Sequence, residues 1–321
     1  MSIREDLIER CARKRDQKVG PLSKEAFAEL TLAVRENPAG FADEAAEQAL
    51  LVLADALDSH RAAARDDDLL DDDAFAAERS RRLRRLMDAC EAACALDAGC
   101  LDALLVHALA EDLEPDELTL RLVGLAAEFD SAEGASTDLW DDPLNRPRLR
   151  LRAAIARTCI DAARFSLARD GARRVVDATL AAGDPLGARH TLMLACARLE
   201  DEDGLNRTEA LFSGRESAWS HLSRILLLYK LGRMSAARRA LRGFDSLCAG
   251  GAYALLHPVY VDLYLPERPE VPACGFEEAV MAVREAEPII ADVPEFIGWC
   301  QGHEWLAASA QSFAERNDLD W

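Results

Sequence analysis

The sequence predicts an all-α fold in which helix pairs stack into a right-handed α-α superhelix, with helical caps at both ends. Half of the 321 residues are apolar, but only 6% are aromatic. Alanine, leucine and arginine, which favour helices, dominate the composition. Almost every stretch between glycines and prolines fits a 3.6-residue pattern better than an alternating one. A helix-turn-helix pattern also recurs along the centre of the chain.

Three landmarks define this repeat: Ala163-Arg164, Ala197-Arg198 and Gly232-Arg233. Each ends an apolar helix and leads within a few residues into a shorter second helix. The steps between them are 34 and 35 residues, and 34 is the period of tetratricopeptide repeats. Such units bury their apolar faces only by stacking on one another. The period therefore predicts a binding module before any other function.

The N-terminal region, residues 1–73, predicts helices near 2–16, 22–36 and 41–64. Proline-containing turns separate these helices. Six aspartates between residues 66 and 73 predict a solvated loop or an acidic helix start. Because that run lacks the glycine and the ligand order of an EF-hand, we expect no calcium there.

The pattern at residues 74–131 predicts degenerate helical repeats. The pattern at residues 132–145 predicts a linker. Residues 146–247 predict tetratricopeptide-like repeats with clear punctuation. There, Gly183 is expected in the left-handed conformation, Asp184 as the cap of the next helix, and Pro185 in its first turn. Residues 248–321 predict a C-terminal helical cap, with helices near 250–264 and 275–287 and a last one from Pro294 to about Arg316.

Charge is distributed unevenly along the chain, whose net charge is −20. Residues 1–145 hold 16 basic and 34 acidic side chains, residues 146–242 hold 19 and 10, and residues 243–321 hold 3 and 14. Two interpretations remain open. Acidic flanks fold against the basic centre and neutralise it, or a basic groove attracts an acidic partner. The net charge argues against nucleic acid and anionic membranes as partners.

An arginine stripe is the strongest candidate site. On the helix that Pro147 opens, Leu151, Ile155, Cys159 and Ala162 share an apolar arc, and Arg150, Arg157 and Arg164 lie on the opposite side with Arg146 above them. Guanidinium groups on a concave surface can bind carboxylates or phosphates bidentately. Arg189, His190 and Met193 would extend the groove on the next first helix. The alternative is a solvated face on which Asp161 pairs with Arg157 and Arg164.

The segment LWDDPLNRPRLRLR at 139–152 resembles the W-x5-R-P-x-[ML]-R-x-R pattern that opens the repeats of certain bacterial tetratricopeptide proteins. These proteins are similar to the suppressor-of-tumorigenicity-seven group. Trp140, Arg146 and Pro147 carry this match. Downstream, AGDPLGAR at 182–189 resembles the group's N-P-x-D-N-x-G-x-R turn, and Gly183, Asp184, Pro185 and Arg189 stand at the corresponding positions. The family's asparagines are replaced by Gly183 and Leu186. The resemblance implies a helical repeat fold and a binding role, but no known ligand.

Motifs of phosphate-binding loops, zinc peptidases and serine hydrolases are absent from the sequence. Cys90, Cys94 and Cys100, which His107 follows, do not have the spacing of zinc ligands. Cys300 and His303 form a lone Cys-His pair between Trp299 and Trp305, where core packing is favoured, so we expect buried thiols, no metal and no cofactor. The N-terminus lacks the apolar core of a secretion signal, and no run is long enough to span a bilayer. With nine cysteines, an odd number, the chain is expected to be reduced and cytoplasmic. Its arginine-rich composition suggests a bacterial source.

These observations predict a non-enzymatic scaffold that binds a protein or peptide with an acidic or carboxylate-bearing segment in its concave groove. The alternative is a ligand- or peptide-sensing regulatory repeat domain, although no basic recognition helix follows a tight turn near the N-terminus. An all-α enzyme is the third possibility, and it would need a cluster assembled from several helices.

Overall fold

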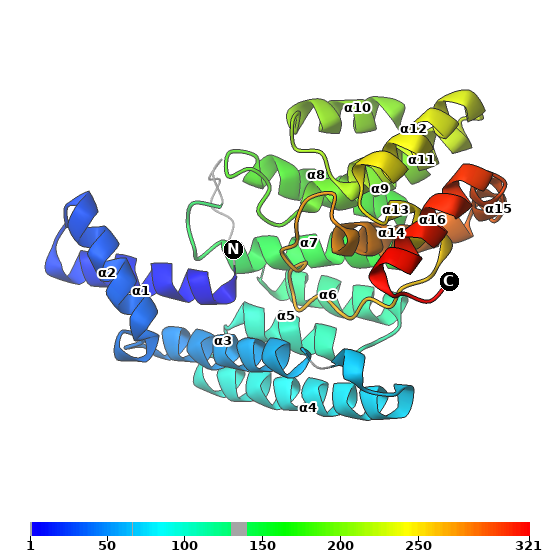
Figure 1. Ribbon diagram of the computed structural model, residues 1–321. Coiled ribbons are helices and arrows are strands. Elements are labelled where there is room, and N and C mark those ends of the chain that lie inside the picture. Colours follow the sequence, from blue (N-terminus) through cyan, green and yellow to red (C-terminus); the bar gives the residue numbers. More distant parts are fainter. Residues whose placement is uncertain (1, 66, 130–139) are drawn as a thin grey trace. The chain divides into compact units, whose positions relative to one another are not determined.

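The computed structural model of the chain describes residues 2–65, 67–129 and 140–321. Within these residues it contains sixteen α-helices, two short 3-10 helices and no strand (Figure 1). The all-α prediction is therefore confirmed. Successive helices pack on one another in both compact units into which the chain divides.

The first compact unit comprises residues 1–154, 181–186 and 263–268. Its helices are α1 (Ile3–Val19), α2 (Lys24–Glu36), α3 (Ala45–Ala63), α4 (Asp72–Leu96), α5 (Leu101–Ala110), α6 (Pro115–Phe129) and the first part of α7 (Arg146–Asp161). Helix α1 packs on α2 and α3, α3 packs on α4, and α4 packs on α5. Buried leucines such as Leu7, Leu53, Leu86 and Leu105 fill the core between them.

The second compact unit comprises residues 155–180, 187–262 and 269–321. After the end of α7 it holds α8 (Phe165–Thr179), α9 (Ala188–Arg198), α10 (Glu202–Leu211), α11 (Ala218–Lys230), α12 (Met234–Leu247), α13 (Gly251–Leu256), α14 (Phe276–Ala291), α15 (Glu295–Gln301) and α16 (Glu304–Asn317). Helix α9 packs on α8, α10 and α11, and α11 also packs on α12 and α14. The units divide within α7, whereas the sequence predicted a linker at 132–145. Residues 130–139 lie outside the described part of the chain.

One turn geometry recurs between the helices of each central pair. A residue in the left-handed region, Ala163, Glu200 or Gly232, follows the first helix. The next residue then donates its backbone N–H to the carbonyl five residues earlier, from Arg164 to Cys159, from Asp201 to Cys196 and from Arg233 to Leu228. These are the hydrogen bonds of a Schellman helix end. The first and third predicted landmarks coincide with this turn, but the second turn lies three residues beyond Arg198.

Several predicted boundaries need correction. Gly183 is left-handed as expected, but so is Asp184, and α9 begins only at Ala188 after a left-handed Gly187. Asp184 therefore does not cap a helix that starts at Pro185. Helix α13 stops at Leu256, because Pro258 disfavours helical backbone at the residue before it. The last predicted helix is divided at Gly302 into α15 and α16.

Two aspartates of the aspartate-rich segment have structural roles, one as a helix cap and one as an ion-pair partner. The Asp71 carboxylate accepts a hydrogen bond from the backbone N–H of Ala74 and caps α4. Asp67 forms two hydrogen bonds, of 2.7 and 2.6 Å, with the guanidinium of the buried Arg82. An acidic helix start is thus confirmed for this run. No helix among the described residues is long and apolar enough to cross a membrane.

Candidate functional site

Arg150 lies in a buried ion-pair cluster of the first unit. Its side chain has no exposed surface, and its Nε and Nη2 donate to Asp102 at 2.8 and 2.7 Å. Its Nη1 donates to Asp6 at 2.5 Å and lies 3.6 Å from Glu267. Burial acts to lower the pKa of Arg150, but the charges of Asp102 and Asp6 outweigh it and raise the pKa. The guanidinium is therefore held charged inside the unit.

Arg146 extends this cluster. Its Nη1 donates to Asp6 at 2.7 Å and to Glu9 at 2.6 Å, and its Nε donates to the Trp140 carbonyl at 2.9 Å. The guanidinium carbon also lies 5.1 Å from the centre of the Trp140 ring, a cation–π distance. The distance in sequence between these two residues is thus explained by packing: Arg146 contacts Trp140 on one side and the carboxylates of α1 on the other. These contacts hold the segment before α7 against α1.

The prediction that Arg146 and Arg150 line a binding groove is corrected by this geometry. Both are almost fully buried, and both are neutralised by carboxylates that precede them in the chain by 48 to 144 residues. A helical wheel places Arg150 opposite the apolar arc of α7, but that opposite side is also covered. For these two arginines, the interpretation in which acidic flanks neutralise the basic centre is confirmed.

Arg157 and Arg164 lie in the second unit and are half-buried. Burial raises the pKa of Asp161 to about 6, although the charges of Arg284 and Arg157 act to lower it. Glu285 of α14 is near enough to raise the same pKa further. The backbone of Arg164 forms the cap between α7 and α8. Arg157 therefore lies among charged groups of its own chain.

The first-helix face, the surface that α9 and α11 present to α14, is covered. Glu278 of α14 accepts hydrogen bonds from the backbone N–H of Ala218 at 2.8 Å and of Cys274 at 2.7 Å. At its other end, Asp292 lies 2.9 Å from Arg198 and 3.8 Å from Lys230. An acidic helix of the same chain thus occupies the face that the repeats were expected to offer to a partner (Figure 1).

An open hollow remains beside this face. The α9–α11 cleft has a volume of about 360 Å³ and is lined by residues of α9, of the end of α10, of the following loop and of the first two turns of α11. The lining residues are Met193, Glu209, Phe212, Ser213, Gly214, Arg215, Glu216, Ser220, His221 and Arg224. Two buried apolar side chains thus meet an exposed loop and charges of both signs. Arg224 is paired with Glu209 and donates to Asn206 at 2.7 Å.

Three predicted groove residues lie at or next to this cleft. Met193 lines it, and the guanidinium carbon of Arg189 is 5.0 Å from the centre of the ring of Phe212, which also lines it. His190 is buried and stacks on Trp219 at 4.2 Å, with its Nδ1 3.4 Å from the Ser217 hydroxyl. Of the three, Met193 alone lines the cleft.

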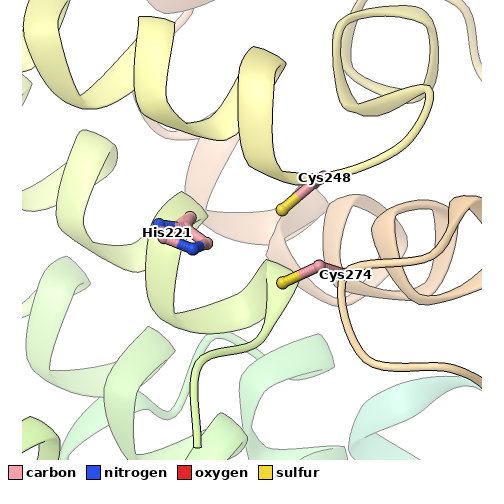
Figure 2. Close-up of side chains that lie close together, drawn as sticks. All are labelled: His221, Cys248 and Cys274. Carbon is pink, nitrogen blue, oxygen red and sulfur yellow. The ribbon is translucent and has the colours of Figure 1, made fainter. Parts of the chain in front are cut away.

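A cluster that the sequence did not indicate shares one residue, His221, with the lining of the cleft. One ligand atom from each of His221, Cys248 and Cys274 lies within 4.8 Å of the other two. They come from α11, from the end of α12 and from the turn before α14 (Figure 2). Burial, and then the neighbouring thiol of Cys274, raises the pKa of Cys248. His221 and Cys248 are 27 positions apart in the chain, and Cys248 and Cys274 are 26 positions apart. These separations are too long for a metal-binding motif to be recognised in the sequence.

The other cysteines are buried in helical packing, except for the half-buried Cys94. Burial raises the pKa of Cys90, Cys100 and Cys300 to about 12 in each case. His303 lies 4.9 Å from the ring of Trp299, and burial lowers its pKa. Among the described residues, the His221, Cys248 and Cys274 cluster is the one group of three such ligands close enough to share an ion.

The chain matches no protein-family model, no curated protein and no solved structure.

Proposed function

We propose that the chain is a non-enzymatic, tetratricopeptide-like scaffold that binds a short protein segment in the α9–α11 cleft. The observation that carries the proposal is the cleft itself. It lies on two consecutive first helices of the repeats and combines the buried side chains of Met193 and Phe212 with an exposed loop. The two apolar side chains provide a place to bury one side chain of a ligand, and the polar residues around them provide hydrogen-bond partners that fix its orientation.

The expected partner presents one apolar side chain to Met193 and Phe212 and a carboxylate to the arginines at the rim. Arg215 is exposed on the loop at the rim of the cleft. We therefore expect a partner carboxylate to meet Arg215. The salt dependence of binding should be modest, since the cleft also carries Glu209 and Glu216.

Selection of displayed random peptides on the immobilised full chain tests this function and identifies the preferred ligand in the same experiment. Enriched peptides should share an apolar residue, and their affinity can be measured by fluorescence polarisation. Ser213→Trp, which fills the cleft from its exposed loop, should abolish binding. Ser246→Trp on the exposed side of α12 is the matched control and should bind normally.

Charge is tested by a second pair of variants. Arg215→Glu should lower the affinity for carboxylate-bearing peptides about 10-fold or more, because a charge-assisted hydrogen bond contributes about 1.5–3 kcal/mol. Arg207→Glu, on the exposed side of α10, serves as its control. Failure to enrich any peptide, or equal binding by the Ser213→Trp and Ser246→Trp variants, would count against the cleft.

The covered first-helix face favours one alternative, a sensing domain in which an acidic segment displaces α14. The Asp292 pairs with Arg198 and Lys230 would hold α14 in place. Asp292→Lys should then increase the affinity for acidic peptides, whereas Asp318→Lys, exposed at the end of α16, should not. Unchanged affinity in both variants would leave the α9–α11 cleft as the binding site.

A further inference from the structure

We propose that His221, Cys248 and Cys274 bind a zinc ion, with the carboxylate of Glu216 as the fourth ligand. The argument for this site does not rest on the proposed peptide binding, although His221 and Glu216 also line the α9–α11 cleft. The site departs from the sequence-based expectation of no metal. Two thiols, one imidazole and one carboxylate are a donor set that suits zinc.

The distances between the ligand atoms are close to those of a tetrahedral site. Zn–S bonds of about 2.3 Å and Zn–N bonds of about 2.0–2.1 Å place two sulfurs about 3.8 Å apart, and a sulfur and a nitrogen about 3.6 Å apart. The three ligand atoms lie within 4.8 Å of one another. Movements of about 1 Å or less, within the reach of side-chain rotation, would bring them around one ion. Figure 2 shows the two sulfurs on the same side of the cluster, facing one another.

The imidazole supplies a second, independent observation. Nε2 of His221 is buried and has no hydrogen-bond partner. A buried polar nitrogen without a partner costs free energy, so its position calls for an explanation. The nearest acidic group is the Glu216 carboxylate, whose Oε2 lies 3.6 Å from Nε2. This distance is too long for a hydrogen bond but close to the roughly 3.4 Å expected between nitrogen and oxygen ligands of one zinc ion.

Glu216 is the acidic side chain best placed to complete the site, because it pairs with His221 and its charge also acts, after burial, to raise the pKa of Cys248 and of Cys274. Its carboxylate lies outside the group of three ligand atoms, so it would have to turn toward the sulfurs when the ion binds. Its side chain is 70% exposed at the edge of the α9–α11 cleft. The ion would therefore be enclosed by the three inner ligands and reached from the cleft.

The backbone around the ligands is fixed by hydrogen bonds. Cys274 adopts a left-handed conformation with φ of 55°, which is uncommon for a residue with a side chain. The backbone N–H of Cys274 donates to the carboxylate of Glu278. The backbone carbonyl of Cys274 accepts a hydrogen bond from the N–H of Ala249, the residue after Cys248. The same Glu278 carboxylate accepts from Ala218 at the start of α11. The three ligand-bearing segments are thus tied together before any ion binds.

Titration of the full chain with cobalt(II) tests the proposal, after purification under reducing conditions and removal of metal with a chelator. One equivalent should produce a thiolate-to-cobalt charge-transfer band and the intense visible bands of four-coordinate cobalt. Zinc should then displace the cobalt, and the melting temperature should rise with zinc, because an ion that binds the folded chain stabilises it.

Single variants identify the ligands. Cys274→Ser and His221→Gln should weaken cobalt binding by at least about 100-fold, more than the 10–100-fold loss typical of outer-shell changes. Glu216→Gln should weaken it less, because water can take the fourth position. The matched control is Cys94→Ser, which changes a half-buried cysteine outside the cluster and should bind cobalt as the wild type does.

Three results would overturn the proposal. One is the absence of stoichiometric cobalt binding by the reduced wild-type chain. Another is unchanged affinity in the Cys274→Ser or His221→Gln variant. The third is a Cys248–Cys274 disulfide that persists under reducing conditions in a chain that takes up no metal. If the Cys274→Ser or His221→Gln variant melts at a much lower temperature without metal, its loss of binding could reflect unfolding. The proposal is then tested by the number of cobalt ions that the wild-type chain binds and by the cobalt spectrum of the Glu216→Gln variant.

Discussion

Replacement of Arg150 by methionine tests how the basic centre of the chain is neutralised. Methionine keeps much of the volume but removes both hydrogen bonds to Asp102, at 2.8 and 2.7 Å, and the contact with Asp6. Asp6 retains Arg146, but Asp102 is left buried without a cation. Removal of one partner from a buried ion pair costs about 3–5 kcal/mol. At about 2–4 °C per kcal/mol, the melting temperature should fall by roughly 6–20 °C.

Denaturant titration with hydrogen exchange measured by mass spectrometry resolves this effect. The loss of protection should concentrate in α1, α5 and the first part of α7, which carry the cluster. Arg148→Met, two residues away and half-buried, is the control and should change stability little. Adding Asp102→Leu to Arg150→Met should recover most of the loss, since replacing both partners of a buried pair is often nearly neutral. Equal stability of Arg150→Met and Arg148→Met would refute the structural role of the cluster.

Three further predictions concern single residues. Because the folded state raises the pKa of Asp161 to about 6, its carboxyl contributes stability at low pH that is lost as pH rises from about 4 through 6. Asp161→Asn should therefore stabilise the second unit above pH 6, and urea titrations should show that this gain vanishes near pH 4. Asp71→Ala should cost about 1 kcal/mol by removing the α4 cap, whereas Asp88→Ala on the exposed side of α4 should not. Gly250→Ala should destabilise the second unit strongly, because φ is +64° and its Cβ would lie 2.6 Å from two phenylalanine rings. Gly243→Ala, which meets nothing within 4 Å inside α12, should instead raise the melting temperature.

Local features of the fold could be predicted from the sequence because their causes are local. Apolar periodicity identified nearly every helix, and glycine, proline and aspartate marked most turns. Errors occurred where one residue mattered, as at Pro258 after α13 and at the left-handed Asp184. Periodicity also identified the apolar arc of α7, but a helical wheel cannot show what covers the other side. Arg150 is buried because carboxylates distant in sequence meet it there.

The candidate sites depended on packing that no local pattern reports. Met193 was predicted as a groove residue from its position on a first helix, and it lines the cleft. The loop residues 213–216 carry no motif, so their part in the cleft follows only from the return of the chain between α10 and α11. The His221, Cys248 and Cys274 cluster likewise arises where three elements end near one another. Its members are too far apart in the sequence for any spacing motif to mark them.

Hydrogen exchange of the full chain with and without a selected peptide tests the central claim most directly. If the α9–α11 cleft is the binding site, the peptide should protect α9 and the segment from the end of α10 into the first two turns of α11. The backbone of α7 around the arginine stripe should exchange as it does in the free chain. Protection confined to α7, with none at residues 212–224, would contradict this account and restore the stripe as the binding surface.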